Sequence, residues 1–171
     1  MIITAGKYKG QKITAPDENI TRPTLSKVRM GIFNTLQSMV DFDGLTFLDM
    51  YAGSGIMGLE AISRGFGYAC CIEKNPKVAG IIKNNFKKFD HKPELFVGDS
   101  LKIAARLNKS FDVIYIDPPY FAGIYEKSLQ AIGELAKDLI ILEHVTDVDF
   151  CGCNLIKQKN YGGKIISFLK K

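Results

Sequence analysis

The stretch from Asp49 to Gly58 reads Asp-Met-Tyr-Ala-Gly-Ser-Gly-Ile-Met-Gly and joins an apolar run, residues 45–50, to a helical pattern, residues 56–63. A short apolar run that ends in an acid is typical of a buried strand. Gly53 and Gly55 let the backbone turn tightly and approach a ligand, because glycine has no Cβ. Their spacing with Gly58 also matches the dinucleotide-binding fingerprint. The stretch therefore predicts a strand, a ligand-binding loop and a helix.

Outward from this unit, strand-like and helix-like segments alternate. Strands are expected at 68–73, 94–97, 111–116 and 139–144, and helices at 76–89, 100–107 and 126–137. Such alternation predicts an α/β fold with a mostly parallel, doubly wound sheet that has helices on both faces. Two β-like pieces, 155–159 and 164–169, surround Gly162 and Gly163 and predict a closing antiparallel hairpin.

The first forty residues have a different pattern. Residues 1–16 contain short β-like pieces around Gly6 and Gly10, which predict a small hairpin. A helix is expected next, since Leu25, Val28, Ile32, Phe33 and Leu36 fall on one helical face. We interpret residues 1–171 as one domain, with an N-terminal hairpin and helix in 1–40 and the core in 44–171.

Composition sets the class of protein. The net charge of +5 permits a nucleic-acid partner without proving one, and the lysines cluster in three regions. These are Lys7, Lys9 and Lys12; Lys83, Lys87, Lys88 and Lys92; and Lys157, Lys159, Lys164, Lys170 and Lys171. No apolar stretch is long enough to cross a bilayer, and the start does not have the layout of a signal peptide, so we expect the cytoplasm. The cysteines lack zinc-site spacing, so no metal is expected.

Acidic residues follow three of the expected strands. Asp49, Glu73 and Asp99 all fall at carboxyl ends of strands, the ligand-binding edge of an open α/β sheet. A fixed negative charge at Asp49 suits the cationic groups of S-adenosylmethionine better than the pyrophosphate of NAD. Glu73 is placed to bind ribose hydroxyls, and Asp99 to accept from an adenine amine, although Asp99 is equally suited to cap the helix that starts at Ser100.

The fourth strand ends in Asp117-Pro118-Pro119-Tyr120. The prolines stiffen the turn and should direct the Pro118 carbonyl into the cleft beyond the strand. That carbonyl and the Asp117 carboxylate form a pair of acceptors, which suits an amino group with two N–H donors. Tyr120 offers a face for a planar ring to stack on. Composition and spacing thus favour a methyltransferase that acts on an amine.

Several motifs in this order resemble one family across almost the whole chain. They are Thr21-Arg22-Pro23-Thr24 with Val28-Arg29, Ala52-Gly53-Ser54-Gly55, Glu73, and Asp117-Pro118-Pro119-Tyr120. Together they resemble the bacterial 16S rRNA methyltransferases that modify N2 of guanine 966. The resemblance implies a class I methyltransferase fold, S-adenosylmethionine as donor, and 16S rRNA within the small ribosomal subunit or its assembly intermediate as partner. Met50-Tyr51 departs from the family's usual pattern, in which an aromatic follows a smaller apolar residue.

The expected site has three parts. The catalytic residues are Asp117, Pro118, Pro119 and Tyr120. The cofactor-binding residues are Arg22, Asp49, Tyr51, Ala52, Gly53, Ser54, Gly55, Glu73, Asp99, Ser100 and Asp117. The substrate-binding residues are Arg22, Lys27, Arg29 and Tyr120. No strong base is required, because the proton leaves after methyl transfer, and we interpret His91 and His144 as structural or surface residues.

Other functions stay open from the residues alone. A DNA adenine-N6 or protein glutamine methyltransferase would present a similar amine or amide to the Asp-Pro-Pro-Tyr motif. A nucleotide-dependent oxidoreductase would use the glycine loop but leaves the two prolines unexplained. A non-catalytic ribosome-assembly factor would have no use for Asp117 beside an intact cofactor loop.

Overall fold

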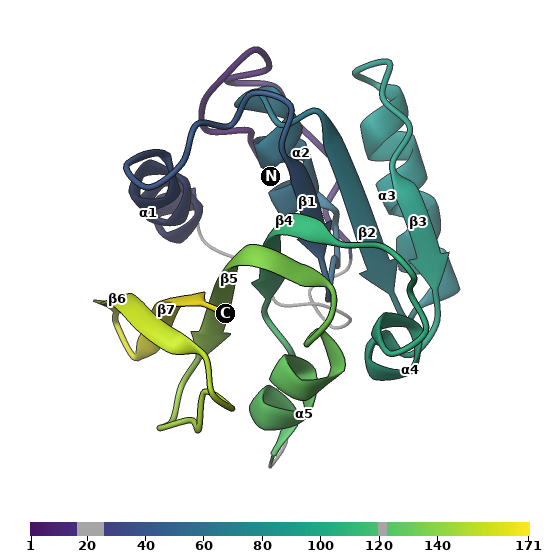
Figure 1. Cartoon of the computed structure of the whole chain (residues 1–171). Coiled ribbons are helices and arrows are strands. Elements are labelled where there is room, and N and C mark those ends of the chain that lie inside the picture. Colours follow the sequence, from purple (N-terminus) through teal and green to yellow (C-terminus); the bar gives the residue numbers. More distant parts are fainter. Residues whose placement is uncertain (17–25, 120–122) are drawn as a thin grey trace.

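The computed structural model describes residues 1–16, 26–119 and 123–171. Its helices are α1 (Ser26–Gln37), α2 (Ile56–Ser63), α3 (Pro76–Lys87), α4 (Ser100–Ala104) and α5 (Ile124–Ala131). Its strands are β1 (Thr46–Asp49), β2 (Tyr68–Glu73), β3 (Glu94–Val97), β4 (Phe111–Ile116), β5 (Ala136–His144), β6 (Asn154–Tyr161) and β7 (Lys164–Lys170). All seven strands join one sheet, shown from one side in Figure 1.

The sheet has the strand order β3-β2-β1-β4-β5-β7-β6. Neighbouring strands from β3 to β5 are parallel, whereas β7 is antiparallel to both β5 and β6. Asp49 is in register with Cys71 of β2 and with Tyr115 of β4, so the last residue of β1 lies at the centre of the carboxyl edge. The order changes direction at β1 and β4, where open α/β sheets bind their ligands.

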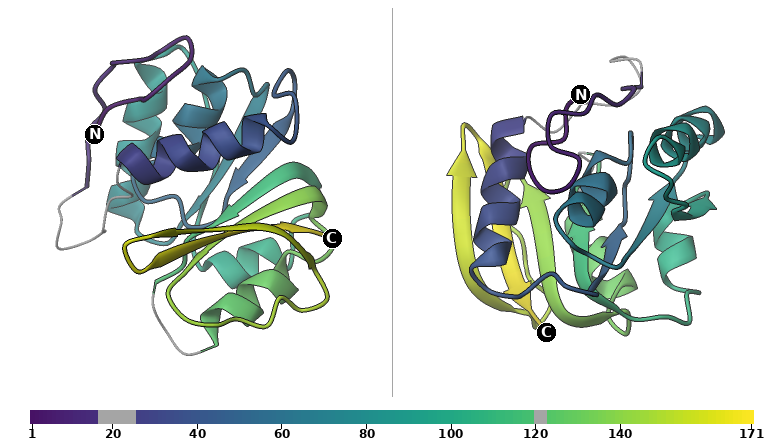
Figure 2. Two further views of the ribbon diagram at one scale, coloured as in Figure 1. Left: turned by 90° about the vertical axis from the view of Figure 1, so that its left-hand side faces the viewer. Right: turned by 90° about the horizontal axis from the view of Figure 1, so that it is seen from above.

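Two apolar layers cover the sheet. On one face, α1, α2 and α3 contribute to a core that includes Phe33, Phe47 and Phe168; on the other, α4 and α5 pack over Ile114 and Leu142. The left view of Figure 2 shows these two sets of helices on opposite sides of the strands. The central strands read as nearly continuous apolar runs because both of their faces are buried.

The first sixteen residues form a hairpin-like segment that packs beside α2 and α3. Ile2 and Lys12 form an antiparallel bridge, while the side chains of Ile3 and Ile13 are buried in the core. The backbone N–H of Tyr8 donates to Ser63 Oγ at the end of α2 (2.9 Å). The predicted hairpin is therefore held against the core by specific contacts.

Most elements lie within a few residues of the bounds that the sequence predicts. The expected helix at 126–137 is wrong at its C-terminal end: α5 ends at Ala131, and β5 begins at Ala136. A turn intervenes, in which the Leu135 N–H donates to the Ile132 carbonyl (2.8 Å). Ala136 and Lys137 belong to the sheet, because Ala136 pairs with Phe111 of β4. Within the described ranges, no helix has the length and apolar character needed to cross a membrane.

Candidate active site

Asp49 ends β1 at the centre of the carboxyl edge and is 1% exposed. Neither carboxylate oxygen accepts a hydrogen bond of normal geometry from the described part of the chain. The pKa of Asp49 is raised to about 8, chiefly because the carboxyl group is buried. The negative charges of Asp117 and, to a lesser extent, Glu73 raise the pKa further, whereas a contact with the Tyr51 backbone N–H lowers it. A buried acid with two unsatisfied oxygens and two acidic neighbours is an attractive position for a cationic group.

Glu73 ends β2 and fastens the glycine loop to the sheet. Its Oε2 accepts the Gly53 N–H (2.9 Å) and its Oε1 accepts the Asn75 N–H (2.7 Å). Each carboxylate oxygen has two lone pairs, so both oxygens keep acceptor capacity for a ligand hydroxyl. Glu73 therefore has a structural task that does not exclude the predicted ribose contact.

The glycine loop adopts the conformation that its sequence predicts. Gly53 and Gly55 have φ values of 52° and 77°, in the left-handed region that glycine enters without a steric penalty. A Cβ at Gly55 would lie 3.1 Å from Ile82 Cγ2 and 3.2 Å from Phe86 Cε2, so the loop also packs closely on α3. The Ala52 N–H donates to the Ile72 carbonyl (2.9 Å), which aligns the loop with β2.

Asn85 supports the loop from behind. This fully buried residue of α3 donates from Nδ2 to the Ser54 carbonyl (3.1 Å) and to the Thr14 carbonyl (2.9 Å). Its Oδ1 accepts the Thr14 N–H (2.9 Å). Asn85 thus ties the glycine loop to the N-terminal segment. A polar residue beside Ile82 and Phe86 on the apolar face of α3 was the signal for this role in the sequence, and our sequence reasoning missed it.

Asp99 is the N-cap of α4, as one of its two sequence interpretations predicts, and its Oδ1 accepts the Lys102 N–H (3.1 Å). Ser100 is buried in the first turn. Tyr51 projects to the other side of the sheet, where its hydroxyl lies 2.8 Å from Ser128 Oγ of α5. Burial raises the pKa of Tyr51, and the charge of Asp99 adds to that effect. Tyr51 is thereby an anchor for the loop on the face opposite to α3.

Asp117 directly follows β4 and is partly exposed, whereas Pro118 behind it is buried and Pro119 is exposed. Asp117 lies close enough to Asp49 for its charge to contribute to the raised pKa of that carboxyl group. The expected amine acceptors and the expected cofactor acids therefore meet at one edge of the sheet. Tyr120 lies outside the described residues, as does Arg22.

The residues present fit S-adenosylmethionine. Asp49 lacks a counter-charge that an ammonium or sulfonium group would supply. The pyrophosphate of NAD would instead bring two negative charges to a site that already holds Asp49, Glu73 and Asp117. The electrostatics of the site thus favour a cationic cofactor.

The expected substrate residues separate into different environments. Lys27 is exposed in the first turn of α1, where a contact with RNA stays a prediction. Arg29 is 1% exposed: its Nη2 donates to the Ile2 carbonyl (2.7 Å), and its Nε lies 3.6 Å from Glu60 Oε1. This burial contradicts the expectation that Arg29 contacts RNA. Instead, Arg29 and Arg64 flank the fully buried Glu60, and Arg29 ties α1 to the N-terminal segment.

A further polar chain at the carboxyl edge was not found from the sequence. Tyr115 donates from its hydroxyl to Glu143 Oε2 (2.9 Å), and Lys164 forms an ion pair with Glu143 Oε1. Glu143 is fully buried near the end of β5, and Lys164 starts β7. No local pattern indicates this chain, because it depends on the pairing of β4, β5 and β7.

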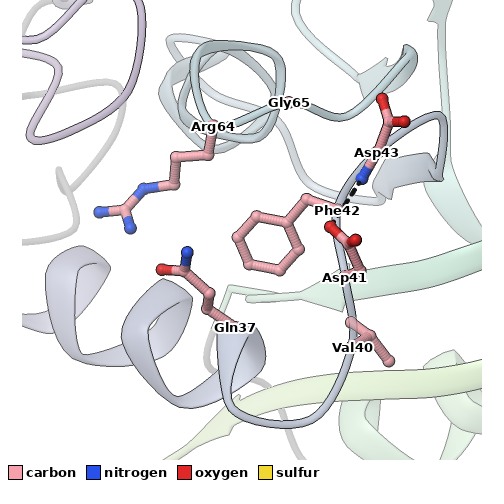
Figure 3. Close-up of a pocket in the computed structure, with 7 residues that line it drawn as sticks. All are labelled: Gln37, Val40, Asp41, Phe42, Asp43, Arg64 and Gly65. Atoms are coloured by element: carbon pink, nitrogen blue, oxygen red, sulfur yellow. Dashed lines mark hydrogen bonds between the residues drawn. The ribbon is translucent and has the colours of Figure 1, made fainter.

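A separate hollow of about 390 Å³ lies at the opposite edge of the sheet, where β1 begins and α2 ends. Figure 3 shows its lining, to which Gln37, Val40, Asp41, Phe42, Asp43, Arg64 and Gly65 contribute. The Arg64 guanidinium is already bonded to Glu60, Asn34 and Thr4. None of its lining residues belongs to the group of Asp49, Glu73 and Asp117, so the hollow is distinct from the candidate active site. Within the described ranges, no three His, Cys, Asp or Glu side chains are grouped as a metal site would require.

The seven-stranded sheet has only β7 reversed, a buried acid at the end of β1 that is unpaired within the described residues, and an Asp-Pro-Pro turn after β4. These features define a class I S-adenosylmethionine-dependent methyltransferase fold. The family model described as "Conserved hypothetical protein 95" matches residues 1–170. The chain belongs to this family, which is that of ribosomal RNA small subunit methyltransferase D.

Individual relatives agree with this assignment. YlbH of Bacillus subtilis (strain 168), provisionally named an rRNA methyltransferase, is 34% identical over 158 residues, which are 87% of this chain and 85% of YlbH. Ribosomal RNA small subunit methyltransferase D of Escherichia coli (strain K12) is 30% identical over 143 residues, which are 81% and 71% of the two chains.

Solved structures share the fold. The Escherichia coli protein yhhF, provisionally named a methyltransferase, superposes with a TM-score of 0.87 at 24% identity, over 100% of this chain and 97% of that one. SMU.776, another provisionally named methyltransferase, was solved in complex with SAH; it has a TM-score of 0.64 at 16% identity, over 85% of this chain and 48% of that one. These likenesses show the fold.

Proposed function

We propose that this protein transfers a methyl group from S-adenosylmethionine to the exocyclic N2 amine of one guanine in the 16S rRNA of the small ribosomal subunit. The observation that carries the proposal is that Asp117, which precedes the buried Pro118 in the sequence, lies near Asp49, whose buried carboxylate has no hydrogen-bond partner of normal geometry in the described residues. Asp117, the proposed acceptor for the amine, and Asp49, the proposed counter-charge for the cofactor, therefore lie at the same carboxyl edge of the sheet. The names of the family's relatives support rRNA of the small subunit as the substrate.

The cofactor residues hold the donor in place. S-adenosylmethionine supplies, when bound, a methyl group on a positively charged sulfur. Asp49 provides the counter-charge for its cationic end, Glu73 accepts from ribose hydroxyls, and the free oxygen of Asp99 accepts from the adenine amine. Because Glu73 already fixes the Gly53 N–H, the loop and the ribose acceptor are pre-organised together.

The Asp-Pro-Pro turn acts on the acceptor. The N2 amine of guanine is a weak nucleophile, since its lone pair is delocalised into the ring. Asp117 and the Pro118 carbonyl accept its two N–H groups, which favours a pyramidal nitrogen and directs the lone pair away from the two acceptors. Alignment and electrostatic support for the charge that develops on nitrogen then account for most of the catalysis. The proton passes to Asp117 or to water after transfer.

The substrate must present an unstacked base. An amine within a stacked helix cannot reach the carboxyl edge of the sheet, so the guanine has to be extruded or already unpaired. RNA proteins commonly read shape and accessible bases. We therefore expect small subunits or their assembly intermediates to be better substrates than protein-free 16S rRNA.

The test is methyl transfer to small subunits isolated from cells that lack this gene. Labelled S-adenosylmethionine should yield N2-methylguanosine among the nucleosides of the digested RNA, and mass spectrometry of nuclease fragments should locate it at one position. Asp117→Ala should lower kcat by roughly 100-fold or more, the scale of losing one preorganised transition-state contact. Its affinity for S-adenosylhomocysteine should change by much less, since Gly53 and Glu73 are untouched.

Asp147→Ala is the matched control, because Asp147 is an exposed acid in the loop after β5 and its loss changes the net charge equally. It should keep full activity. N6-methyladenine in DNA or methylglutamine in protein as the main product would favour the alternative amine methyltransferases. Tight S-adenosylhomocysteine binding without any methyl transfer to small subunits would contradict the proposed enzyme.

A further inference from the structure

Two lysine-rich segments that lie far apart in the sequence meet on one flank of the molecule. Tyr8 packs on Phe89 with ring centroids 4.7 Å apart, and its hydroxyl lies 3.0 Å from His91 Nε2. Farther along, the Thr14 backbone makes two hydrogen bonds with Asn85. The N-terminal segment is therefore held along the second half of α3 and the turn that follows it.

This contact places two groups of lysines on adjoining segments, and we call these seven residues the lysine flank. Its members are Lys7, Lys9, Lys12, Lys83, Lys87, Lys88 and Lys92, and every one is exposed. In the described ranges none of them pairs with an acid, whereas Lys109, Lys137, Lys164, Lys170 and Lys171 all do. The flank therefore presents concentrated positive charge to its surroundings.

The arrangement of these charges has a cost for the isolated protein. Lys83 and Lys87 are four residues apart on α3, a spacing at which like charges repel. Asp90, between Lys88 and Lys92 in the sequence, supplies one negative charge beside these lysines. A surface with this much uncompensated charge is suited to a polyanion, because each lysine gains a counter-charge only when the partner binds.

The flank is continuous with the proposed active site. Helix α3 starts three residues after Glu73 and extends about 18 Å to Lys87, at 1.5 Å per residue. Lys74 and Lys77, both exposed, continue the positive charge to the carboxyl edge. A nucleic acid whose base enters that edge would have flanking phosphates within reach of α3.

We propose that the lysine flank binds the phosphate backbone of the RNA beside the target nucleotide; this inference rests on the function proposed above. Separate, flexible ammonium groups spread over a helix and a neighbouring segment match a chain of repeated negative charges. They contact phosphates as point charges and carry no base specificity. The flank supplies affinity and orientation, while the carboxyl edge selects the base.

The test compares two triple variants with the same loss of charge. Lys83→Gln, Lys87→Gln and Lys88→Gln alter the flank, and glutamine keeps the helix propensity of α3. Lys127→Gln, Lys157→Gln and Lys170→Gln form the control, since these exposed lysines lie on α5, β6 and β7, away from α3. Binding is measured between 50 and 200 mM salt with unmodified small subunits and with protein-free 16S rRNA.

The flank variant should lower the slope of log Kobs against log salt by roughly 2 to 3, close to one counterion for each lost phosphate contact. The control should change it little. Asp90→Asn is the converse variant and should tighten binding roughly two- to fivefold, the range of a single exposed charge contact. Asparagine is also tolerated at the positive φ of 55° that Asp90 adopts.

Equal effects of the two triple variants would overturn the inference, because only total charge would then matter. Weakened binding to small subunits with an unchanged slope on protein-free RNA would also overturn it, since the partner would be a ribosomal protein. These binding assays need no methyl transfer. A wild-type protein that binds RNA through the flank but forms no N2-methylguanosine would contradict the proposed function and leave the inference standing.

Discussion

Replacing Asp49 with asparagine should make the free protein more stable at neutral and alkaline pH. The folded chain keeps this carboxyl group protonated up to about pH 8, whereas in the unfolded chain it ionises near its ordinary pKa of 3.8. Between these values the folded state binds more protons than the unfolded state. Linkage then requires the free energy of unfolding to fall as pH rises through the window. Asparagine has no proton to lose, so the variant escapes this decline.

The size of the effect follows from the window. One pH unit corresponds to about 1.4 kcal/mol, so between pH 5 and pH 8 the stability of Asp49→Asn relative to wild type should grow by roughly 4 kcal/mol. Urea unfolding at each pH measures it, with equal m-values as evidence that the two proteins unfold alike. Asp43→Asn, at an exposed position before β1, is the control and should follow the wild type.

The bound state should behave in the opposite way. S-adenosylhomocysteine has no sulfonium charge, but its α-ammonium group, bound beside Asp49, favours the ionised carboxylate. The affinity of the wild type for S-adenosylhomocysteine should therefore rise by up to about tenfold per unit between pH 6 and pH 8. Asp49→Asn should bind more weakly and show a flatter profile in titration calorimetry. Parallel stability curves for variant and wild type would refute the buried-acid argument, and equal affinities would refute the role of Asp49 in holding the cofactor.

Three more substitutions test other contacts. Glu73→Gln replaces a doubly accepting carboxylate by an amide with one acceptor; urea unfolding should show a loss of about 1–3 kcal/mol, and calorimetry a weaker S-adenosylhomocysteine complex. Gly31→Ala places a Cβ against the Tyr161 ring, 2.8 Å from Cζ, and should cost about 1–3 kcal/mol, most of which a second change, Tyr161→Ala, should remove in a double-mutant cycle. Asn85→Asp loses the amide that serves two carbonyl groups and should lower Tm and cofactor affinity together, whereas unchanged binding would show that the glycine loop does not need this support.

The sequence predicted best the features with a local physical cause. The strands Tyr68–Glu73, Glu94–Val97 and Phe111–Ile116 begin and end where expected, because polar residues, glycine or proline bound their apolar runs. The acids that end β1 and β2 and the acid that follows β4 were expected at one edge, and the parallel sheet brings Asp49, Glu73 and Asp117 near one another. Their individual roles toward cofactor and substrate stay predictions.

Features that depend on distant partners escaped the sequence. Arg29 had the appearance of a surface cation, and only the fold shows that Glu60, thirty-one positions later, meets it in the interior. The bonds of Glu143 with Tyr115 and Lys164 require the strand order β4-β5-β7. The raised pKa of Asp49 arises from burial and from acids on other strands, neither of which is written in its neighbours along the chain.

The position of β7 between β5 and β6 has a consequence for how the chain is made. Strand β6 leaves the ribosome first but has no place in the sheet until β7 follows and inserts beside β5. Until then β5 is an open edge that carries Ile140, Ile141 and Leu142, the kind of edge that recruits other chains. A nascent chain stalled before Lys164 would therefore be prone to aggregate although its glycine loop and Asp-Pro-Pro turn have already been synthesised.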